Sequence, residues 1–287
     1  MQPRFFGDDD SQLYGVYHTP RGKVNRPFKA VVICPPTGQD YIRSHWCLKL
    51  LANQLTRKGV HVLRFDYAGT GDSPGSFEDV KSIETWQDNI RQAIRHIREQ
   101  SKAETVMLAG LRTGAAFAAQ VAQDNADVNS VVLWEPVVDG ARYVGNLRNQ
   151  HADMLDLWVC KMQTQNDERH EELLGSLFSR SLLDEIEDLK SAYDSIVQPQ
   201  LIIKLDSVDD QFQHPEQSIQ KIVSVDDENS WHDPGSLETA WLRPATTRIV
   251  VRNIDDMFKR LERFEALTHP ASTEMNETPI ASTGVLV

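Results

Sequence analysis

The feature that most constrains the fold is a strand, a tight turn and a helix between residues 105 and 119. The apolar run Thr105–Leu111 has the composition of a buried strand, and the Ala-rich run after Gly114 favours a helix. Gly110 and Gly114 stand four residues apart, which allows the backbone to turn sharply between the two elements. Arg112 lies in the middle of this turn. A strand that leads directly into a helix is typical of a sheet covered by helices.

The same alternation continues on both sides of this turn. Further strands are predicted at Leu13–Tyr17, Lys29–Cys34, Val60–Phe65, Ser130–Pro136, Gln200–Asp206 and Lys221–Asp226. Helices are predicted where apolar residues recur at helical spacing, around residues 46–55, 83–97 and 249–264. The predicted fold class is therefore α/β, with a mostly parallel central sheet flanked by helices.

The alternation is interrupted once, which suggests how the chain is divided. Residues 1–139 and 198–267 are predicted to form the core, and residues 140–197 an inserted helical cap without a strand. Its helical fragments are expected at Tyr143–Met162, Glu171–Phe178 and Leu182–Tyr193. Such an insertion would cover the carboxyl ends of the strands, where open α/β sheets bind ligands. Residues 268–287, rich in Thr, Ser and Pro, are expected to be a flexible or docked tail.

Composition excludes several classes of function. The chain of 287 residues carries a net charge of −12, which disfavours binding to nucleic acid or to an anionic membrane. No apolar run reaches the roughly 20 residues that span a bilayer, and the N-terminus lacks the apolar stretch of a signal peptide. The three cysteines lack metal-ligand spacing and suit reduced thiols in a cytoplasm. Neither a metal nor a cofactor is expected.

Several motifs occur in a characteristic order. They are Pro35-Pro-Thr-Gly38 after a strand, the loop Phe65-Asp-Tyr-Ala-Gly-Thr-Gly-Asp-Ser-Pro-Gly75, the turn Gly110-Leu-Arg-Thr-Gly114, and Trp134-Glu-Pro-Val-Val-Asp-Gly140. From about residue 5 to 266 the chain resembles the α/β-hydrolase superfamily, in particular its serine-aminopeptidase-like group. Within that group it is most similar to the second type of exosortase-associated hydrolase.

The resemblance implies a catalytic triad in which the residue at the position of the nucleophile is replaced. The middle residue of the glycine turn is the serine nucleophile in this superfamily, and here it is Arg112. An arginine has no nucleophilic oxygen and keeps its charge. By the order of the family, Asp209 would be the acid and His232 the base that it orients.

The resemblance also implies where a substrate oxygen would bind. Thr37, Gly38 and Gln39 would supply one half of an oxyanion hole, and the N–H of Thr113 the other half. The alternative for the first segment is a structural turn imposed by the two prolines before it. The Thr113 hydroxyl is expected to cap the following helix rather than to act as a nucleophile.

Two interpretations of Arg112 remain open. As a clamp, its guanidinium would bind a carboxylate or phosphate beside a helix N-terminus. As a plug, it would pair with Asp209 or Glu135 and fill an inactive site, because a buried arginine needs an anion. Trp134 would line the pocket or belong to the core, and His45 is a second candidate histidine.

Three functions follow as hypotheses. In the first, the chain binds an acyl or carboxylate-bearing small molecule through Arg112, for non-hydrolytic chemistry or as a partner in a pathway. In the second, it hydrolyses an ester or thioester with water activated by His232 and Asp209. In the third, it is catalytically inactive and binds a protein partner, or a second copy of itself, through the cap or the tail.

Overall fold

A single large sheet organises the chain, as seen in a computed structural model that describes residues 1–21, 24, 26–157, 164, 166–190, 195–205, 220–226 and 243–268. In the described residues the strands of this sheet are β1 (Gln2–Phe6), β2 (Leu13–His18), β3 (Lys29–Cys34), β4 (His61–Phe65), β5 (Thr105–Leu111), β6 (Ser130–Trp134), β9 (Gln200–Leu205) and β10 (Gln220–Val225). The helices that flank it are α1 (Gly38–Arg57), α2 (Ile83–Ser101), α3 (Thr113–Gln123) and α6 (Pro244–Thr268), and a short 3-10 turn, η1, spans Phe77–Asp79.

The strand order brings β3, β5 and β6 together in the middle of the sheet. The order is β1-β2-β4-β3-β5-β6-β9-β10, and the strands from β4 to β10 run parallel. The N-terminal strands β1 and β2 are antiparallel to their neighbours, with Phe5 opposite Tyr14. Parallel strands end at the same edge, so the residues that follow β3 and β5 lie close to each other.

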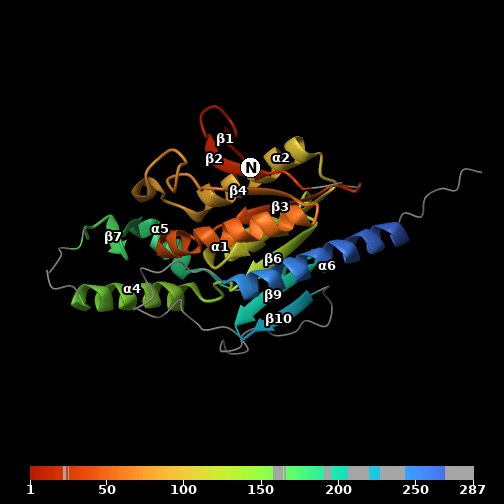
Figure 1. The fold of residues 1–287 in the computed structure, drawn as a ribbon. Coiled ribbons are helices and arrows are strands. Elements are labelled where there is room, and N and C mark those ends of the chain that lie inside the picture. The colour runs from red at the N-terminus through yellow and green to blue at the C-terminus, as the bar shows by residue number, and fades with distance from the viewer. Residues whose placement is uncertain are drawn as a thin grey trace, which may run out of the picture.

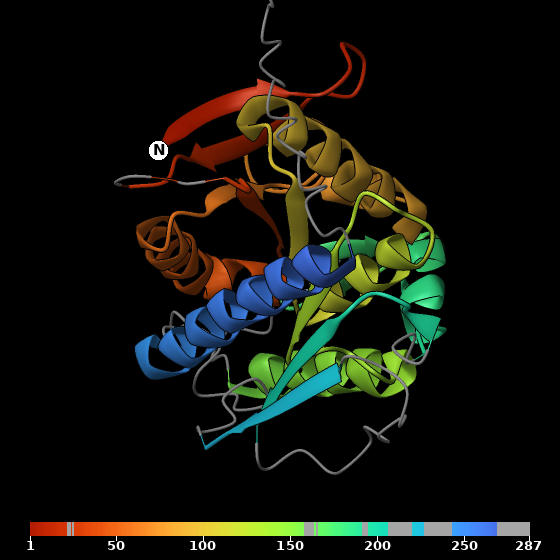
Figure 2. The same ribbon diagram turned by 90° about the vertical axis from the view of Figure 1, so that its right-hand side faces the viewer.

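Helices cover both faces of the sheet, which leaves two separate hydrophobic cores. Helices α1 and α6 pack on one face, and α2 and α3 on the other (Figures 1 and 2). Side chains of β3 alternate between the two cores: Val31 and Ile33 face α1 and α6, while Val32 and Cys34 face α2 and α3. A central strand that is apolar at every position is therefore explained by burial on both faces.

The insertion between β6 and β9 differs from its predicted structure. It contains α4 (Gly140–Leu157) and α5 (Arg180–Glu187), but the segment expected as a helix at 171–178 is a hairpin of β7 (His170–Leu173) and β8 (Ser176–Ser179). The prediction of a helix there was wrong because the turn was missed. Leu174 and Gly175 form a two-residue loop with positive φ at both positions, 50° and 79°, which suits the twist of a hairpin.

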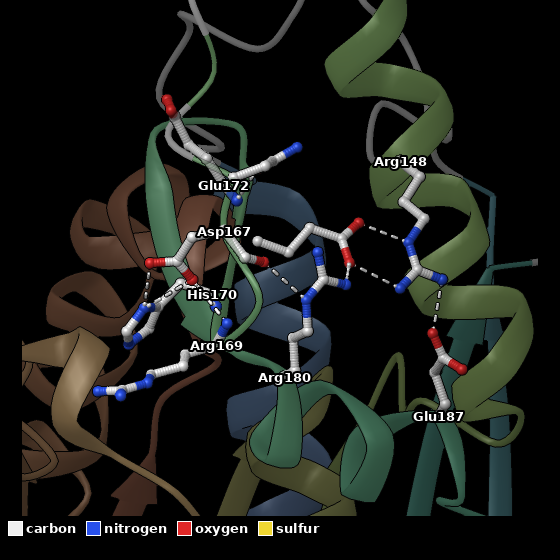
Figure 3. Close-up of polar contacts among 9 residues, drawn as sticks. Arg148, Asp167, Arg169, His170, Glu172, Arg180 and Glu187 are labelled. Carbon is white, nitrogen blue, oxygen red and sulfur yellow. Dashed lines mark hydrogen bonds and ion pairs between the residues drawn. The ribbon is translucent and has the colours of Figure 1, made fainter.

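Ion pairs tie the hairpin to both helices of the insertion. Arg148 of α4 contacts Glu171 of β7 through two nitrogens, at 2.7 and 2.9 Å, and Glu187 of α5 at 2.6 Å (Figure 3). Arg180 contacts the same Glu171 carboxylate at 3.5 Å. Figure 1 shows α4, α5 and β7 together at one end of the molecule. The hydrophobic core beside α2 and α3 continues into this insertion through Tyr143 and Phe178.

No helix among the described residues combines the length and apolar character that a bilayer crossing requires.

Candidate active-site region

The turn between β5 and α3 has the strained backbone of a sharp elbow. Arg112 has φ 55° and ψ −120°, a conformation that non-glycine residues rarely adopt. Its N–H donates to the Trp134 carbonyl at 3.0 Å, and its carbonyl accepts from the N–H of Ala115 at 3.1 Å. Backbone hydrogen bonds to β6 and α3 therefore hold the elbow in place.

The two glycines are required because the backbones around them approach too closely for a side chain. A Cβ on Gly110 would lie 2.4 Å from the Cα of Ala115, and one on Gly114 would lie 2.2 Å from the carbonyl oxygen of Pro35. Glycine at these positions lets α3 pack directly against β5 and against the chain that leaves β3. The spacing seen in the sequence thus has a steric cause.

The Arg112 side chain is buried and paired with Asp40 of α1. Its Nε lies 3.3 Å from Asp40 Oδ2, and the two side chains are only 12% and 7% exposed. Tyr143 of α4 completes the group: its ring centroid is 5.4 Å from the Arg112 Cζ, and its hydroxyl donates to Asp40 Oδ2 at 3.2 Å. Burial, assisted by the Asp40 charge, raises the pKa of the Tyr143 hydroxyl well above its ordinary value.

Asp40 is a partner of Arg112 that was not foreseen. Of the two expected partners, Asp209 lies outside the described residues, so a pair between Arg112 and Asp209 stays a prediction. A signal for the pair with Asp40 was present, since Asp40 follows β3 and Arg112 follows β5, and these strands are neighbours. Glu135 is buried at the end of β6 with φ 46°, and its N–H donates to the Ile203 carbonyl at 2.8 Å.

Thr113 contacts the segment after β3 instead of capping its own helix. Its hydroxyl accepts from the N–H of Thr37 at 3.1 Å and lies 3.2 Å from the Thr37 hydroxyl. The N-cap of α3 is Arg112, whose side chain makes no capping hydrogen bond, so the expectation that Thr113 caps the helix was wrong. The N–H of Thr37, one of the candidate donors for an oxyanion hole, is therefore already satisfied by a protein oxygen.

The other predicted ligand-binding residues are divided between this region and the core. Gly38 begins α1 with φ 59°, and Phe178 of the hairpin approaches it, 3.1 Å from where a Cβ would lie. Gln39 is half-buried in the same turn. Trp134 is 2% exposed within the core that α1 and α6 cover. Thr37, Gly38 and Gln39 directly precede Asp40, which is the ion-pair partner of Arg112. These three residues therefore lie near the elbow, whereas Trp134 belongs to the core.

Both predicted triad partners, His232 and Asp209, lie outside the described residues. His45 lies in α1, where burial lowers its pKa and its ring meets Trp46 edge-on. Among the residues that the structure describes, no group of three or more His, Cys, Asp or Glu is placed to hold a metal ion.

Known structures share this architecture. Est1E from Butyrivibrio proteoclasticus, solved with ferulic acid bound, superposes with a TM-score of 0.61 at 15% identity, over 91% of this chain and 99% of that one. A serine hydrolase homologue from Coxiella burnetii gives a TM-score of 0.50 at 15% identity, over 88% and 96%. These likenesses establish the fold, and the predicted α/β-hydrolase fold is confirmed.

A family model described as serine aminopeptidase, S33 matches residues 26–205, the span from just before β3 to the end of β9. No curated protein matches the sequence.

Proposed function

Because the chain belongs to the serine aminopeptidase S33 family of α/β hydrolases, we propose that it is a non-hydrolytic member that binds an acyl or carboxylate-bearing ligand through Arg112. Arg112 occupies the elbow position that carries the nucleophile in serine hydrolases of this fold, and it supplies a fixed positive charge there. The ligand would then undergo other chemistry, or its binding would make the chain a partner in a biosynthetic pathway. The motif Gly110-Leu-Arg112 favours the second type of exosortase-associated hydrolase within this proposal.

The contact that carries the proposal is the one between Arg112 and Asp40. A carboxylate oxygen already lies 3.3 Å from the Arg112 Nε, so the surroundings of this guanidinium accept a carboxylate. A ligand carboxylate that engages two guanidinium nitrogens would form a stronger, bidentate pair. The N-terminus of α3 adds backbone N–H groups and the positive end of a helix dipole at the same place.

The insertion acts as the cap in this proposal. Tyr143 of α4 contacts both members of the ion pair, and Phe178 of β8 lies against Gly38 in the turn after β3. The ligand's acyl part would therefore meet aromatic side chains from residues 140–197, while its charged end meets Arg112.

A second candidate is an inactive interaction protein, and two observations favour it. Arg112 is already neutralised by Asp40, and the Thr37 N–H already has the Thr113 hydroxyl as its acceptor. Both contacts fill the elbow with protein groups. In this case a second protein, or another copy of the chain, would bind through the cap or the tail.

Calorimetric titration with hexanoate and with the neutral analogue hexanamide tests the first candidate. We expect hexanoate to bind, and hexanamide or the variant Arg112→Met to bind about tenfold more weakly or worse. Arg91→Met, which changes an arginine on the surface of α2, serves as the control and should bind as the wild type does. Equal binding of hexanoate by Arg112→Met, or no binding by the wild type, contradicts the proposal.

Activity assays separate the remaining hypotheses. A panel of nitrophenyl esters and acyl thioesters should give no turnover above background. Turnover that is lost in His232→Ala would instead establish a hydrolase that activates water. In Arg112→Ser, labelling by a serine-directed phosphonate is expected, because backbone contacts and glycines define the elbow without the Arg112 side chain.

A further inference from the structure

A cavity lies between α1 and the strands β2 and β4, and Arg112 of the elbow is not among the residues that line it. Its volume is about 240 Å³. Apolar walls come from Val16, Ile33, Pro35, Leu48 and Phe65, and polar groups from Tyr14, Tyr41, His45, Lys49, Arg64, Asp66 and Asp72. A water molecule takes about 30 Å³ of liquid, so the space equals roughly eight waters, enough for an organic acid with one ring.

Arg64 places a positive charge in this cavity. It lies in β4, between β2 and β3 in the sheet, and it is half-buried. Among the described residues it forms no ion pair, and its one hydrogen bond is from Nε to the Nε2 of His18 at 3.2 Å. Burial lowers the pKa of Arg64, and the nearby Asp66 only partly offsets this effect. The two terminal nitrogens of the guanidinium therefore remain for a ligand.

Asp66 attracts Arg64 electrostatically, but among the described residues no carboxylate forms an ion pair with the Arg64 guanidinium. Both carboxylate oxygens of Asp66 are engaged, Oδ1 by the Tyr41 hydroxyl at 2.7 Å and Oδ2 by the Asp72 N–H at 3.0 Å. Lys49 adds a second cation at the cavity wall, with its ammonium 4.4 Å from the centroid of the Trp46 ring. His18 accepts a hydrogen bond from Arg64, so that ring nitrogen carries no proton and His18 adds no charge of its own.

We propose that this cavity binds a small organic carboxylate, with its charged end on the Arg64 guanidinium and its apolar body against Val16, Ile33 and Leu48. Arginine presents its terminal nitrogens as a planar fork that matches a carboxylate. A partly buried cation is costly to desolvate, and no carboxylate among the described residues contacts Arg64 directly, so an anion that enters the cavity and contacts the guanidinium stabilises it. This site is independent of the ligand proposed for Arg112, since a different cation from a different strand holds it.

Binding of benzoate, with benzamide as its neutral analogue, tests the inference. We expect benzoate to bind in calorimetric titrations, and benzamide to bind about tenfold more weakly or worse because it lacks the charge. Arg64→Met should weaken benzoate binding by a similar factor. Arg112→Met and the surface variant Arg57→Met should leave it unchanged, which separates this site from the elbow. Arg64→Lys keeps the charge without the fork and should give an intermediate affinity.

A local signal in the wild type avoids any dependence on the folding of the variants. The His45 ring lines the cavity, so its NMR resonances should shift on addition of benzoate, with the same saturation curve as the heat. The proposal is overturned if the wild type binds no benzoate, if benzamide binds equally well, if Arg64→Met binds benzoate unchanged, or if the His45 resonances stay fixed while heat is released.

Discussion

The ion pair of Arg112 and Asp40 shows how burial changes the contribution of a charged side chain to stability. In water the two groups would attract each other weakly, but here both are almost fully covered. Removal of one partner from a buried pair leaves the desolvation cost of the other unbalanced, which is more damaging than the loss of the attraction alone. The Tyr143 hydroxyl, which donates to Asp40, depends on the same carboxylate.

Asp40→Asn should therefore destabilise the protein by about 3 kcal/mol in urea unfolding. The amide keeps the shape of the side chain but loses the negative charge that faces Arg112. The double variant Asp40→Asn/Arg112→Met should recover part of this loss, because the buried cation is then absent. A single variant as stable as the wild type would show that the ion pair does not stabilise the fold.

His18 should make stability depend on pH. Burial, with the nearby Arg64 charge, lowers the pKa of His18 from 6.5 to about 4. As pH falls below 6.5 the unfolded chain binds a proton at His18 and the folded chain does not, so the free energy of unfolding decreases down to about pH 4. The full difference is about 3 kcal/mol.

His18→Gln is the matched variant, since its side-chain oxygen can accept the hydrogen bond from Arg64 and does not titrate. Its free energy of unfolding, measured in urea at pH 7 and pH 4.5, should fall less than that of the wild type. An equal fall in both proteins would contradict the assignment to His18.

The contacts of individual side chains were harder to predict from the sequence than the helices and strands. Arg112 was located correctly at the turn, because the flanking glycines mark it. Its contact with Asp40 depends on which strands are adjacent in the sheet, and that information is not local. The Arg64 cavity was missed for the same reason, since its walls come from α1 and three strands that are separated along the chain.

The elbow shows that a helix can approach a neighbouring strand closely only where glycine leaves room for the backbone. Gly114 is packed against the backbone of the segment after β3, whereas Gly145 in α4 has no atom within 4 Å of the position of a Cβ. The same substitution is therefore expected to act in opposite directions at the two sites.

Gly114→Ala should destabilise the protein by about 3 kcal/mol or more, because the methyl group would overlap the Pro35 carbonyl. Gly145→Ala should stabilise it by about 0.5–1 kcal/mol, because alanine loses less backbone entropy in a helix. Thermal or urea unfolding of the two variants measures both effects. A tolerated methyl group at position 114 would mean that the elbow is looser than described.

The sequence predicted elements well where their periodicity was clear and less well in the insertion. The apolar strands from β3 to β6 and the amphipathic helix α2 were placed within a few residues. The hairpin at 170–179 was missed because its strands are four residues long and its only turn signal is Gly175. Short strands carry too few residues for alternation to be distinguished from a helical pattern.

For the whole molecule, the shared sheet should make its two cores unfold together. Cys34 is fully buried in the core beside α2 and α3, and Cys47 in the core beside α1 and α6. Burial raises the pKa of the Cys34 thiol, which makes its reactive thiolate still rarer.

In the background Cys160→Ser, which removes the remaining thiol, both cysteines should resist thiol reagents under native conditions. When denaturant is added they should become labelled at the same rate, as measured by mass spectrometry of each peptide. Labelling of Cys47 well before Cys34 would show that α1 and α6 detach while the other face stays folded.

The overall architecture could be predicted because burial on both faces of a parallel sheet leaves a strong apolar signal in each central strand. The helical content of the insertion was predicted in part, at α4 and α5.

The elbow, finally, is defined by atoms that do not belong to the side chain it displays. Backbone bonds to Trp134 and Ala115, and the bare Cα atoms of Gly110 and Gly114, set its course. The residue at position 112 can therefore be substituted, by evolution or by design, while the backbone of the elbow keeps its conformation. The chemistry offered at this position can therefore change by single substitutions, without any change in the backbone that presents the side chain.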